Sequence, residues 1–312
     1  MQTPEPPPAR RSPLVGGMDV GGSKIETGLF DGRFHALERR RVDTACATYE
    51  ELLDCIAGEV RWLDSRSGGA VDLGIGLPGL VDQANGRALT SNLPATGRPL
   101  REDLAAKLGR SIAMANDCKC FALSEANGGA GEGSQISLGL ILGTGVGGGV
   151  TRQGRLVLGY NDLPGELGHL GIPGRLVAQC SLPLLLCGCG RIGCYETLVS
   201  GPGLVRLAAR HGGAGRTPKE IAQLARSGDE AMAATMREWL TLLAELIHTA
   251  QCTIDMDCVV LGGGLSRIPA VAQMLADTYR TRQISSRETR FAVARFGDAS
   301  GTRGAAMLLT HS

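Results

Sequence analysis

The chain has 312 residues, which is long enough for two domains that each bury a core. Hydrophobic residues make up 43% of it and charged residues 20%, and 32 basic residues nearly balance 31 acidic ones to give a formal net charge of +1. Because no field of a single sign is available to hold a phosphate backbone or an anionic membrane, we expect no nucleic-acid partner and no membrane partner.

Residues 1–13 are rich in proline and predict a disordered tail. They lack the apolar stretch of a secretory signal, and no apolar run in the chain reaches the ~18 residues that span a bilayer. The 10 cysteines therefore indicate a reducing compartment rather than a disulfide framework. We expect a cytoplasmic protein.

The first predicted elements are two strands, 15–20 and 25–30, joined by a glycine turn. Backbone N–H groups beside a hydroxyl and a lysine can approach an anion, and Asp19 stands next to them for a hydrated Mg²⁺. A plain glycine hairpin is the alternative interpretation. The candidate phosphate-binding residues of this turn are Gly21, Gly22, Ser23 and Lys24.

Alternating strands and helices follow up to residue 126. The apolar spacing predicts strands over 34–42, 71–79 and 111–115, and helices over 49–64, 100–108 and 117–126. Gly79 ends a buried strand and places irregular backbone at the mouth of a sheet, where α/β proteins bind ligands. Asn92, in a polar loop, either bonds a substrate hydroxyl or belongs to a solvated turn.

Asp117 stands where a predicted strand ends and a helix begins. Aspartate at this place is commonly a helix N-cap. A single carboxylate there can also act as general base on a hydroxyl, with Asn116 orienting the same substrate. The sequence leaves both interpretations open.

A second glycine-rich run follows the apolar strand 137–142. It contains Gly-x-Gly-x-x-Gly, but a dinucleotide fingerprint requires a helix next, and here a second strand follows and turns at Gln153-Gly154. The run therefore predicts a second phosphate clamp of the same design as the first. Its candidate residues are Gly143, Thr144, Gly145, Val146 and Gly147.

One histidine and three cysteines bracket the segment 165–196, which has little apolar periodicity of its own. A tetrahedral zinc bound by one imidazole and three thiolates would hold this segment closed, and four protein ligands would leave no open position for catalysis. Cys180 is an alternative to one of the four, and a buried or redox-active cysteine cluster is the other interpretation. Glu166 and Glu196 flank the set and suggest a polar substrate pocket. The four candidate ligands are His169, Cys187, Cys189 and Cys194.

The remaining chain predicts helices over 200–209, 218–225 and 229–254, strands over 258–261 and 291–296, and a terminal helix over 301–309. Gly263 and Gly264 follow the strand 258–261. A glycine loop at a strand's carboxyl end either lies against an adenosine or makes a simple tight turn.

These features fit phosphoryl transfer from a nucleotide to a sugar hydroxyl. Asp117 would take the hydroxyl proton, and the glycine turns with Mg²⁺ would bear the transition-state charge. Closure of two domains would keep water from the phosphoryl group.

Nearly the whole chain after the tail also resembles the ROK family of sugar kinases. The resemblance rests on Asp-x-Gly-Gly-Ser-Lys at 19–24, Asn-Asp at 116–117, the glycine run 143–149, Gly-Glu-x-Gly-His at 165–169 and Cys-x-Cys-Gly-x-x-Gly-Cys-x-Glu at 187–196. It implies an α/β, two-domain, actin-like ATPase fold of the hexokinase type, which is ribonuclease H-like. It also implies ATP with Mg²⁺, a structural zinc on the four ligands named above, and sugar contacts from Glu166, His169 and Glu196.

Three stretches, 91–100, 120–126 and 140–149, are most similar to bacterial N-acetyl-D-glucosamine kinases. The implied reaction is transfer from ATP to the 6-hydroxyl of that sugar. A fructokinase or glucokinase of the same family is the alternative. A sugar-responsive repressor or non-catalytic sensor is disfavoured, because only the short tail precedes the first phosphate motif and because Asp117 is intact.

The resemblance implies three parts after the tail: a small N-terminal α/β domain at 14–117, a large α/β domain with the zinc loop at 118–297, and a C-terminal helix at 298–312 that joins the small domain. Family members are often dimers, so the resemblance implies a homodimer. Ser23 replaces the usual threonine and keeps the hydroxyl. Cys118 and Lys119 replace small residues after the catalytic pair, and we expect Lys119 to point to solvent.

Overall fold

The structure is a computed structural model that describes residues 14–44, 46–82, 85–90 and 92–311. The predicted tail at 1–13 lies outside the described residues. Strands and helices alternate as an α/β protein should, and most bounds agree with the sequence prediction to within a few residues. Across the described residues, every helix falls short of the length and apolarity needed to cross a bilayer.

Two five-stranded sheets share one topology, in the order β3-β2-β1-β4-β7 and β10-β9-β8-β11-β12. In each sheet the central strand pairs antiparallel with the strand that follows it and parallel with a later strand. The first sheet consists of β1 (Val15–Val20), β2 (Lys24–Phe30), β3 (Ala36–Asp43), β4 (Asp72–Leu77) and β7 (Ala113–Asn116). The second consists of β8 (Ile136–Leu142), β9 (Val146–Arg152), β10 (Arg155–Leu156), β11 (Cys258–Gly262) and β12 (Arg290–Val293).

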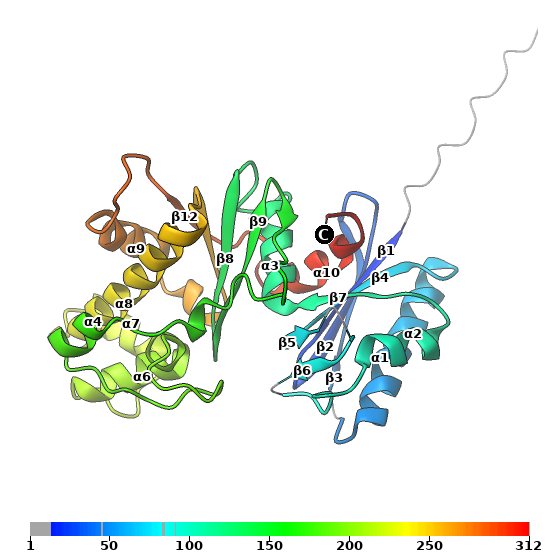
Figure 1. The fold of residues 1–312 in the computed structure, drawn as a ribbon, viewed down its shortest axis with the longest axis horizontal. Helices are drawn as coiled ribbons and strands as arrows, with labels where there is room; N and C mark the ends of the chain where they lie inside the picture. Colours follow the sequence, from blue (N-terminus) through cyan, green and yellow to red (C-terminus); the bar gives the residue numbers. More distant parts are fainter. Residues whose placement is uncertain (1–13, 45, 83–84, 91, 312) are drawn as a thin grey trace, which may run out of the picture.

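Two helices connect the halves by crossing over. Helix α3 (Asp117–Ala126) follows β7 of the first sheet but packs on β8 and β9 of the second. Helix α10 (Ser300–His311) follows β12 of the second sheet but packs on β1 and β4 of the first. The two helices also pack against each other between the sheets (Figure 1). The predicted attachment of the C-terminal helix to the N-terminal half agrees with this packing, while the boundary between residues 117 and 118 stays a prediction.

Glycines allow these helices to approach so closely. A Cβ on Gly17 in β1 would collide with the carbonyl oxygen of Thr302, and one on Gly304 in α10 would collide with the carbonyl oxygen of Cys120. Since both obstacles are backbone atoms, neither can move aside cheaply. These two glycines are packing positions inside a strand and a helix rather than turn positions.

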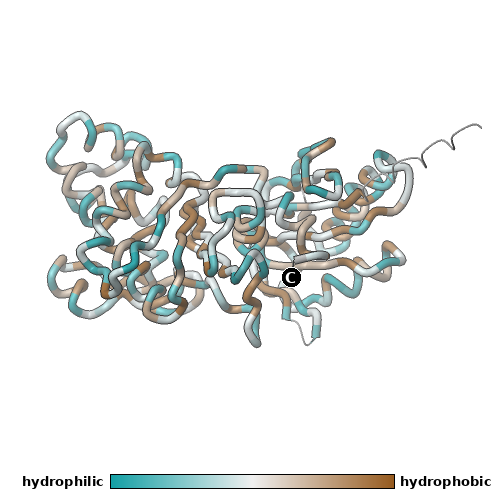
Figure 2. Tube along the Cα trace, turned by 90° about the horizontal axis from the view of Figure 1, so that it is seen from above, coloured by the Kyte–Doolittle hydropathy of each residue, from teal (hydrophilic) through white to brown (hydrophobic). Residues whose placement is uncertain are grey.

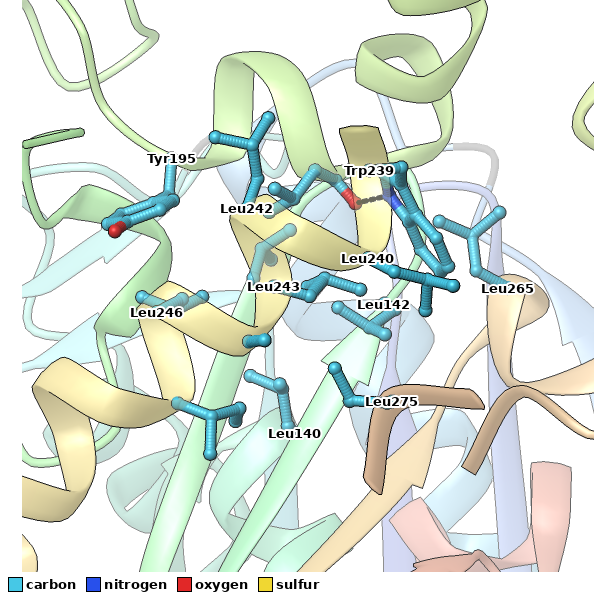
Figure 3. Close-up of a cluster of buried hydrophobic side chains, with 14 of the residues drawn as sticks. Leu140, Leu142, Tyr195, Trp239, Leu240, Leu242, Leu243, Leu246, Leu265 and Leu275 are labelled. Carbon is cyan, nitrogen blue, oxygen red and sulfur yellow. Dashed lines mark hydrogen bonds between the residues drawn. The ribbon is translucent and has the colours of Figure 1, made fainter. Parts of the chain in front are cut away.

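The outer face of each sheet carries its own helices and core. On the first sheet these are α1 (Tyr49–Ser67), which begins with a capping box from Thr48 and Glu51, and α2 (Leu100–Leu108). On the second they are α6 (Gly201–Arg210), α7 (Pro218–Arg226), α8 (Glu230–Ile254) and α9 (Val271–Arg280). Figure 3 shows Leu140 and Leu142 of β8 beneath Leu243 and Trp239 of α8. The tube in Figure 2 shows the hydrophilic colour mainly on outer loops and helix faces.

Several short elements were not expected from the sequence, because each is too short to show a periodicity. They are β5 (Gly79–Val81), β6 (Ala88–Thr90), α4 (Gly174–Gln179), α5 (Glu196–Val199) and the 3-10 turns at Leu167–His169, Gly264–Arg267 and Gly297–Ala299.

Candidate active site

The first glycine turn connects β1 to β2 and is closed by a hydrogen bond from the Gly21 N–H to the Lys24 carbonyl at 2.9 Å. The Ser23 carbonyl accepts from the Thr44 N–H at 3.0 Å, which ties the turn to the end of β3. A Cβ on Gly22 would lie 2.7 Å from the Cβ of Asn92. The turn and the polar loop of Asn92 are therefore neighbours, as a shared substrate site requires.

Asp19 and Asp117 line one pocket of about 320 Å³ together with the glycine loop that follows β11. Three separate parts of the sequence thus meet at one place, which lies against the first turn of α10. The other lining residues used below are Gly263, Ser266, Asp298 and Gly301. Gly264 begins the 3-10 turn beside this pocket.

Burial raises the pKa of the Asp19 carboxyl to about 7, with further upward contributions from the charges of Asp117 and Glu26 and an opposing one from Lys24. Burial also raises the pKa of Asp117, against the N–H of Cys118, which donates to its Oδ1 at 2.8 Å. Two half-buried carboxylates in one pocket disfavour each other's charge unless a cation joins them. A hydrated Mg²⁺, whose ligands are carboxylate and phosphate oxygens, fits this donor set.

The N-cap of α3 is Asn116. Its Oδ1 accepts from the Cys118 N–H at 2.8 Å, and its Nδ2 donates to the carbonyl of Gly79 at 2.9 Å. Asp117 is the first residue inside the helix rather than its cap. The capping role that the sequence left open for Asp117 thus belongs to its neighbour, and the Asp117 carboxylate faces the pocket.

The second glycine turn joins β8 to β9, with a hydrogen bond from the Gly143 N–H to the Gly145 carbonyl at 3.0 Å. The strand that follows confirms the expectation of a glycine hairpin in place of a dinucleotide-binding helix. Glu196, at the start of α5, accepts from the Val146 N–H at 2.9 Å. A Cβ on Gly147 would lie 2.8 Å from the Cys118 sulfur, so the turn lies against the start of α3. Thr144 is at the tip of this turn.

The segment 165–169 packs tightly along β9. A Cβ on Gly165, which has a φ of 107°, would collide with the Gly148 carbonyl, and one on Gly168 would collide with that of Val146. These contacts explain the glycine spacing and fix Glu166 between two immobile positions. Burial raises the pKa of Glu166, while nearby His169 and Lys119 oppose the rise.

The four predicted zinc ligands come together. The ligand atoms of His169, Cys187, Cys189 and Cys194 all lie within 4.8 Å of one another. The His169 Nδ1 is 3.6 Å from the Cys187 sulfur, and its Nε2 is 4.0 Å from Glu166 on the other side of the ring. One imidazole and three thiolates at this separation fit a tetrahedral zinc.

Cys180 lies outside this group. It follows α4 and packs against the larger hydrophobic core. Among the described residues, the group of ligand atoms contains the four residues named above and leaves out Cys180. The choice of these four as zinc ligands stays a prediction, and this grouping supports it.

The expectation that Lys119 points to solvent is wrong. Helix α3 is enclosed by the second sheet, by α10 and by the segment after β10, so its third residue has no route to water. The Lys119 ammonium forms an ion pair with the carboxylate of Asp162 and also donates to the Asp162 backbone carbonyl. Both residues are fully buried.

Sequence reasoning also missed Glu125 at the C-terminal end of α3. Its buried carboxylate accepts from the N–H groups of Ala130, Arg295 and Phe296 at 2.9, 2.9 and 3.0 Å, and from the Ser300 hydroxyl at 2.7 Å. It fastens the segment that leads from the pocket of Asp19 and Asp117 into α10. A glutamate inside an apolar helical run was the available signal, because such a carboxylate must find donors.

Comparison with known proteins agrees with this geometry. The chain is 40% identical over 296 residues to the N-acetylgalactosamine kinase AgaK of Shewanella sp. (strain ANA-3), covering 94% of this chain and 95% of that one. It is also 40% identical over 296 residues to the N-acetyl-D-glucosamine kinase of Shigella sonnei (strain Ss046), covering 94% and 98%.

Among solved structures, the ROK hexokinase of Thermus thermophilus superposes with a TM-score of 0.84 at 30% identity, over 95% of this chain and 97% of that one. A ROK family glucokinase of Streptomyces griseus, in complex with glucose and AMPPNP, gives a TM-score of 0.75 at 28% identity, over 95% and 98%. The fold is the actin-like one of these kinases. Residues 15–312 match the ROK family, and the chain belongs to it.

Proposed function

We propose that this protein is a cytoplasmic kinase that transfers the γ-phosphoryl group of ATP to the 6-hydroxyl of N-acetyl-D-glucosamine, giving N-acetylglucosamine 6-phosphate and ADP. The observation that carries the proposal is the pocket in which Asp19, Asp117 and the Gly263 loop meet. The names of the relatives that are 40% identical support the choice of an amino sugar.

Asp117 is the general base. It lies at the start of α3, inside the pocket, with one oxygen held by the Cys118 N–H. The other oxygen is available for the proton of the attacking hydroxyl. Its raised pKa makes the ionised Asp117 carboxylate a better proton acceptor than an ordinary aspartate.

The two glycine turns and the Gly263–Gly264 loop bind the nucleotide. The N–H groups of Gly21, Gly143 and Val146 close the turns or bond Glu196, so the backbone N–H groups of Gly22 and Ser23 and of Thr144 and Gly145 face the phosphates. Lys24 adds a positive charge. Mg²⁺, when bound with ATP, supplies charge neutralisation at the β- and γ-phosphates. The Asp19 carboxylate, which lines the pocket, would hold the hydrated ion.

The sugar lies between the first sheet and the zinc loop. Asn92, Asn116 and the backbone at Gly79 contact it from the first half, and the side chains of the zinc loop contact it from the second. Those side chains are Glu166, His169 and Glu196. Zinc on Nδ1 of His169 would leave Nε2 beside Glu166, so the metal fixes the imidazole for the sugar and performs no chemistry.

Phosphorylation of N-acetylgalactosamine is a second candidate, because a kinase named for that sugar has the same 40% identity. The two acceptors differ only in the configuration of one hydroxyl, at C4. Glucose and fructose are weaker candidates, and the structural relatives that suggest hexoses are 30% and 28% identical.

A panel of acceptors with ATP as donor tests the proposal. We expect N-acetylglucosamine to give the highest kcat/KM. A panel led by N-acetylgalactosamine would replace the acceptor, and one led by glucose or fructose would overturn the amino-sugar assignment. No ADP release with any acceptor would overturn the kinase assignment.

Light scattering after gel filtration tests the expected homodimer.

A further inference from the structure

The buried ion pair between Lys119 and Asp162 has no part in the function proposed so far. Its side chains are 1% and 2% exposed, so water does not reach either charge. Burying two charges costs much of what their attraction returns, and apolar residues of the same volume are often as stable. Stability alone therefore does not account for this pair.

The pair joins two segments that carry different parts of the proposed site. Lys119 is two residues beyond Asp117 on α3, and Asp162 is four residues before Glu166. The ammonium reaches both the carboxylate and the backbone carbonyl of Asp162, so it holds the chain at two atoms of one residue. Asp162 has a φ of 57°, which gives this loop a fixed left-handed corner.

The link from Asp162 to Glu166 is short and stiff. Pro164 lies within it, and the Glu166 N–H donates to the Leu163 carbonyl at 3.1 Å. Gly165 is wedged against the Gly148 carbonyl of β9. A displacement of Asp162 would therefore be passed to Glu166 rather than absorbed in between.

We propose that the Lys119–Asp162 ion pair is a positioning device for the sugar acceptor. It fixes the segment 157–166 against α3, and thereby sets the distance between Glu166, which holds the sugar, and Asp117, which takes its proton. This inference rests on the proposed function for the roles of Glu166 and Asp117. Its physical content, a tether between α3 and the segment before the zinc loop, does not depend on the identity of the sugar.

Lys119→Met tests the tether, because methionine keeps most of the side-chain volume and loses the charge. Asp162→Asn removes the carboxylate charge, leaves the backbone carbonyl as an acceptor, and is tolerated at a positive φ. The matched control is Lys107→Met, which breaks an exposed lysine–aspartate pair with Asp54 at 2.7 Å on α2 and α1.

At a temperature where circular dichroism shows each variant folded, we expect Lys119→Met to raise KM for the amino sugar at least tenfold and to lower kcat. KM for ATP should stay within twofold of the wild type. Asp162→Asn should show the same pattern with a smaller change, and Lys107→Met should show none. Wild-type constants in folded Lys119→Met, or an equal rise in both KM values, would overturn the proposal.

Hydrogen exchange of the peptide covering residues 157–166 supplies a readout that needs no turnover. Faster exchange there in Lys119→Met, and not in Lys107→Met, supports the tether; unchanged exchange overturns it. If Lys119→Met does not fold, the same kinetic and exchange criteria applied to Asp162→Asn decide. If the wild type phosphorylates no sugar, the proposed function fails, and the exchange result still decides whether the pair holds this segment.

Discussion

The two halves of the molecule share one sheet topology but differ in the charged residues beside their glycine turns. Their five-stranded sheets have the same strand order, and each central strand, β1 or β8, enters a glycine turn. The first turn is flanked by Asp19 and Lys24, whereas residues 143–149 include no charged residue. A carboxylate from α5, that of Glu196, reaches the second turn and accepts the Val146 N–H. Repeating a sheet therefore repeats the shape of the proposed phosphate clamp, while the charged groups are placed separately in each half.

The crossing helices make the halves interdependent. Helix α3 carries Asp117 from the first sheet onto the second, and α10 returns from the second sheet to lie over Asp19. A Cβ on Gly301 in α10 would collide with the Asp19 carboxylate. Each half thus presents a helix to the other half's site. Variants at equivalent positions of the two halves can therefore separate the effect of the repeated architecture from the effect of residues found in one half.

The largest effect is expected at Asp117, which begins the crossing helix α3, whereas the other crossing helix, α10, begins with Ser300. Asp117→Asn keeps the shape and removes the base, so kcat should fall about 10²- to 10⁴-fold while KM for the sugar changes little. Steady-state kinetics with ATP and the best acceptor measure both constants. A variant that keeps more than a tenth of wild-type kcat would contradict the assignment of the base.

Burial raises the pKa of Asp117, so the acid limb of the wild-type kcat profile should lie above the pH range of an ordinary carboxylate. The sign follows from the role of the group: kcat is highest where Asp117 is ionised and falls as the pH drops through its raised pKa. In Asp117→Asn this limb should be absent from the residual activity.

The next effect compares the two helix-packing glycines, Gly17 in β1 and Gly139 in β8. A Cβ on Gly17 meets the backbone oxygen of Thr302, whereas one on Gly139 meets carbon atoms of Ala122 at 2.8 Å. Gly17→Ala should lower the free energy of unfolding by about 3 kcal/mol or more, and Gly139→Ala by about 1–2 kcal/mol. Urea unfolding measures both.

Gly69→Ala is the control for this pair, because nothing lies within 4 Å of the added Cβ. It should change the free energy of unfolding by less than about 0.5 kcal/mol. Equal destabilisation by the Gly17 and Gly139 substitutions would show that the two helices pack alike, and would remove this difference between the halves.

The sequence predicted most of the regular elements, because buried strands and amphipathic helices leave apolar periods that are visible locally. It also indicated Asp19 and Asp117 as candidates, since Asp19 lies at the end of β1 and Asp117 directly follows β7, and both line one pocket. The packing glycines escaped it: the partner of Gly17 is Thr302, far along the chain. The same holds for Lys119, whose burial depends on a loop that has no periodicity of its own.

A smaller effect is expected from the zinc loop, which belongs to the second half alone. Cys187→Ala should lose bound zinc and raise KM for the sugar about tenfold or more, because His169 and Glu166 lose their fixed positions. KM for ATP should change less, since none of the four zinc ligands belongs to either glycine turn. Elemental analysis of the purified proteins and steady-state kinetics measure these changes.

Cys180→Ala is the matched control, because Cys180 is a cysteine of the same segment outside the ligand group. It should retain zinc and both KM values. Wild-type protein purified without chelators and found free of zinc would refute the metal site.

The smallest effect is a pH dependence of stability that only the first turn should show. Burial, with the nearby charges of Asp117 and Glu26, raises the pKa of Asp19 to about 7, above the value of 3.8 that we take for the unfolded chain. A raised pKa means that the folded state binds the proton more tightly, so this contribution is complete below pH ~4 and is lost as the pH rises through about 7.

Between pH 6 and pH 8, without magnesium or nucleotide, Asp19 should remove about 1.4 kcal/mol of the free energy of unfolding. Asp19→Asn cannot ionise and should lack this loss, so the difference between its urea unfolding and that of the wild type isolates the contribution of Asp19. An identical change from pH 6 to pH 8 in both proteins would contradict it. Because residues 143–149 carry no carboxylate, no substitution in the second turn should produce the same difference.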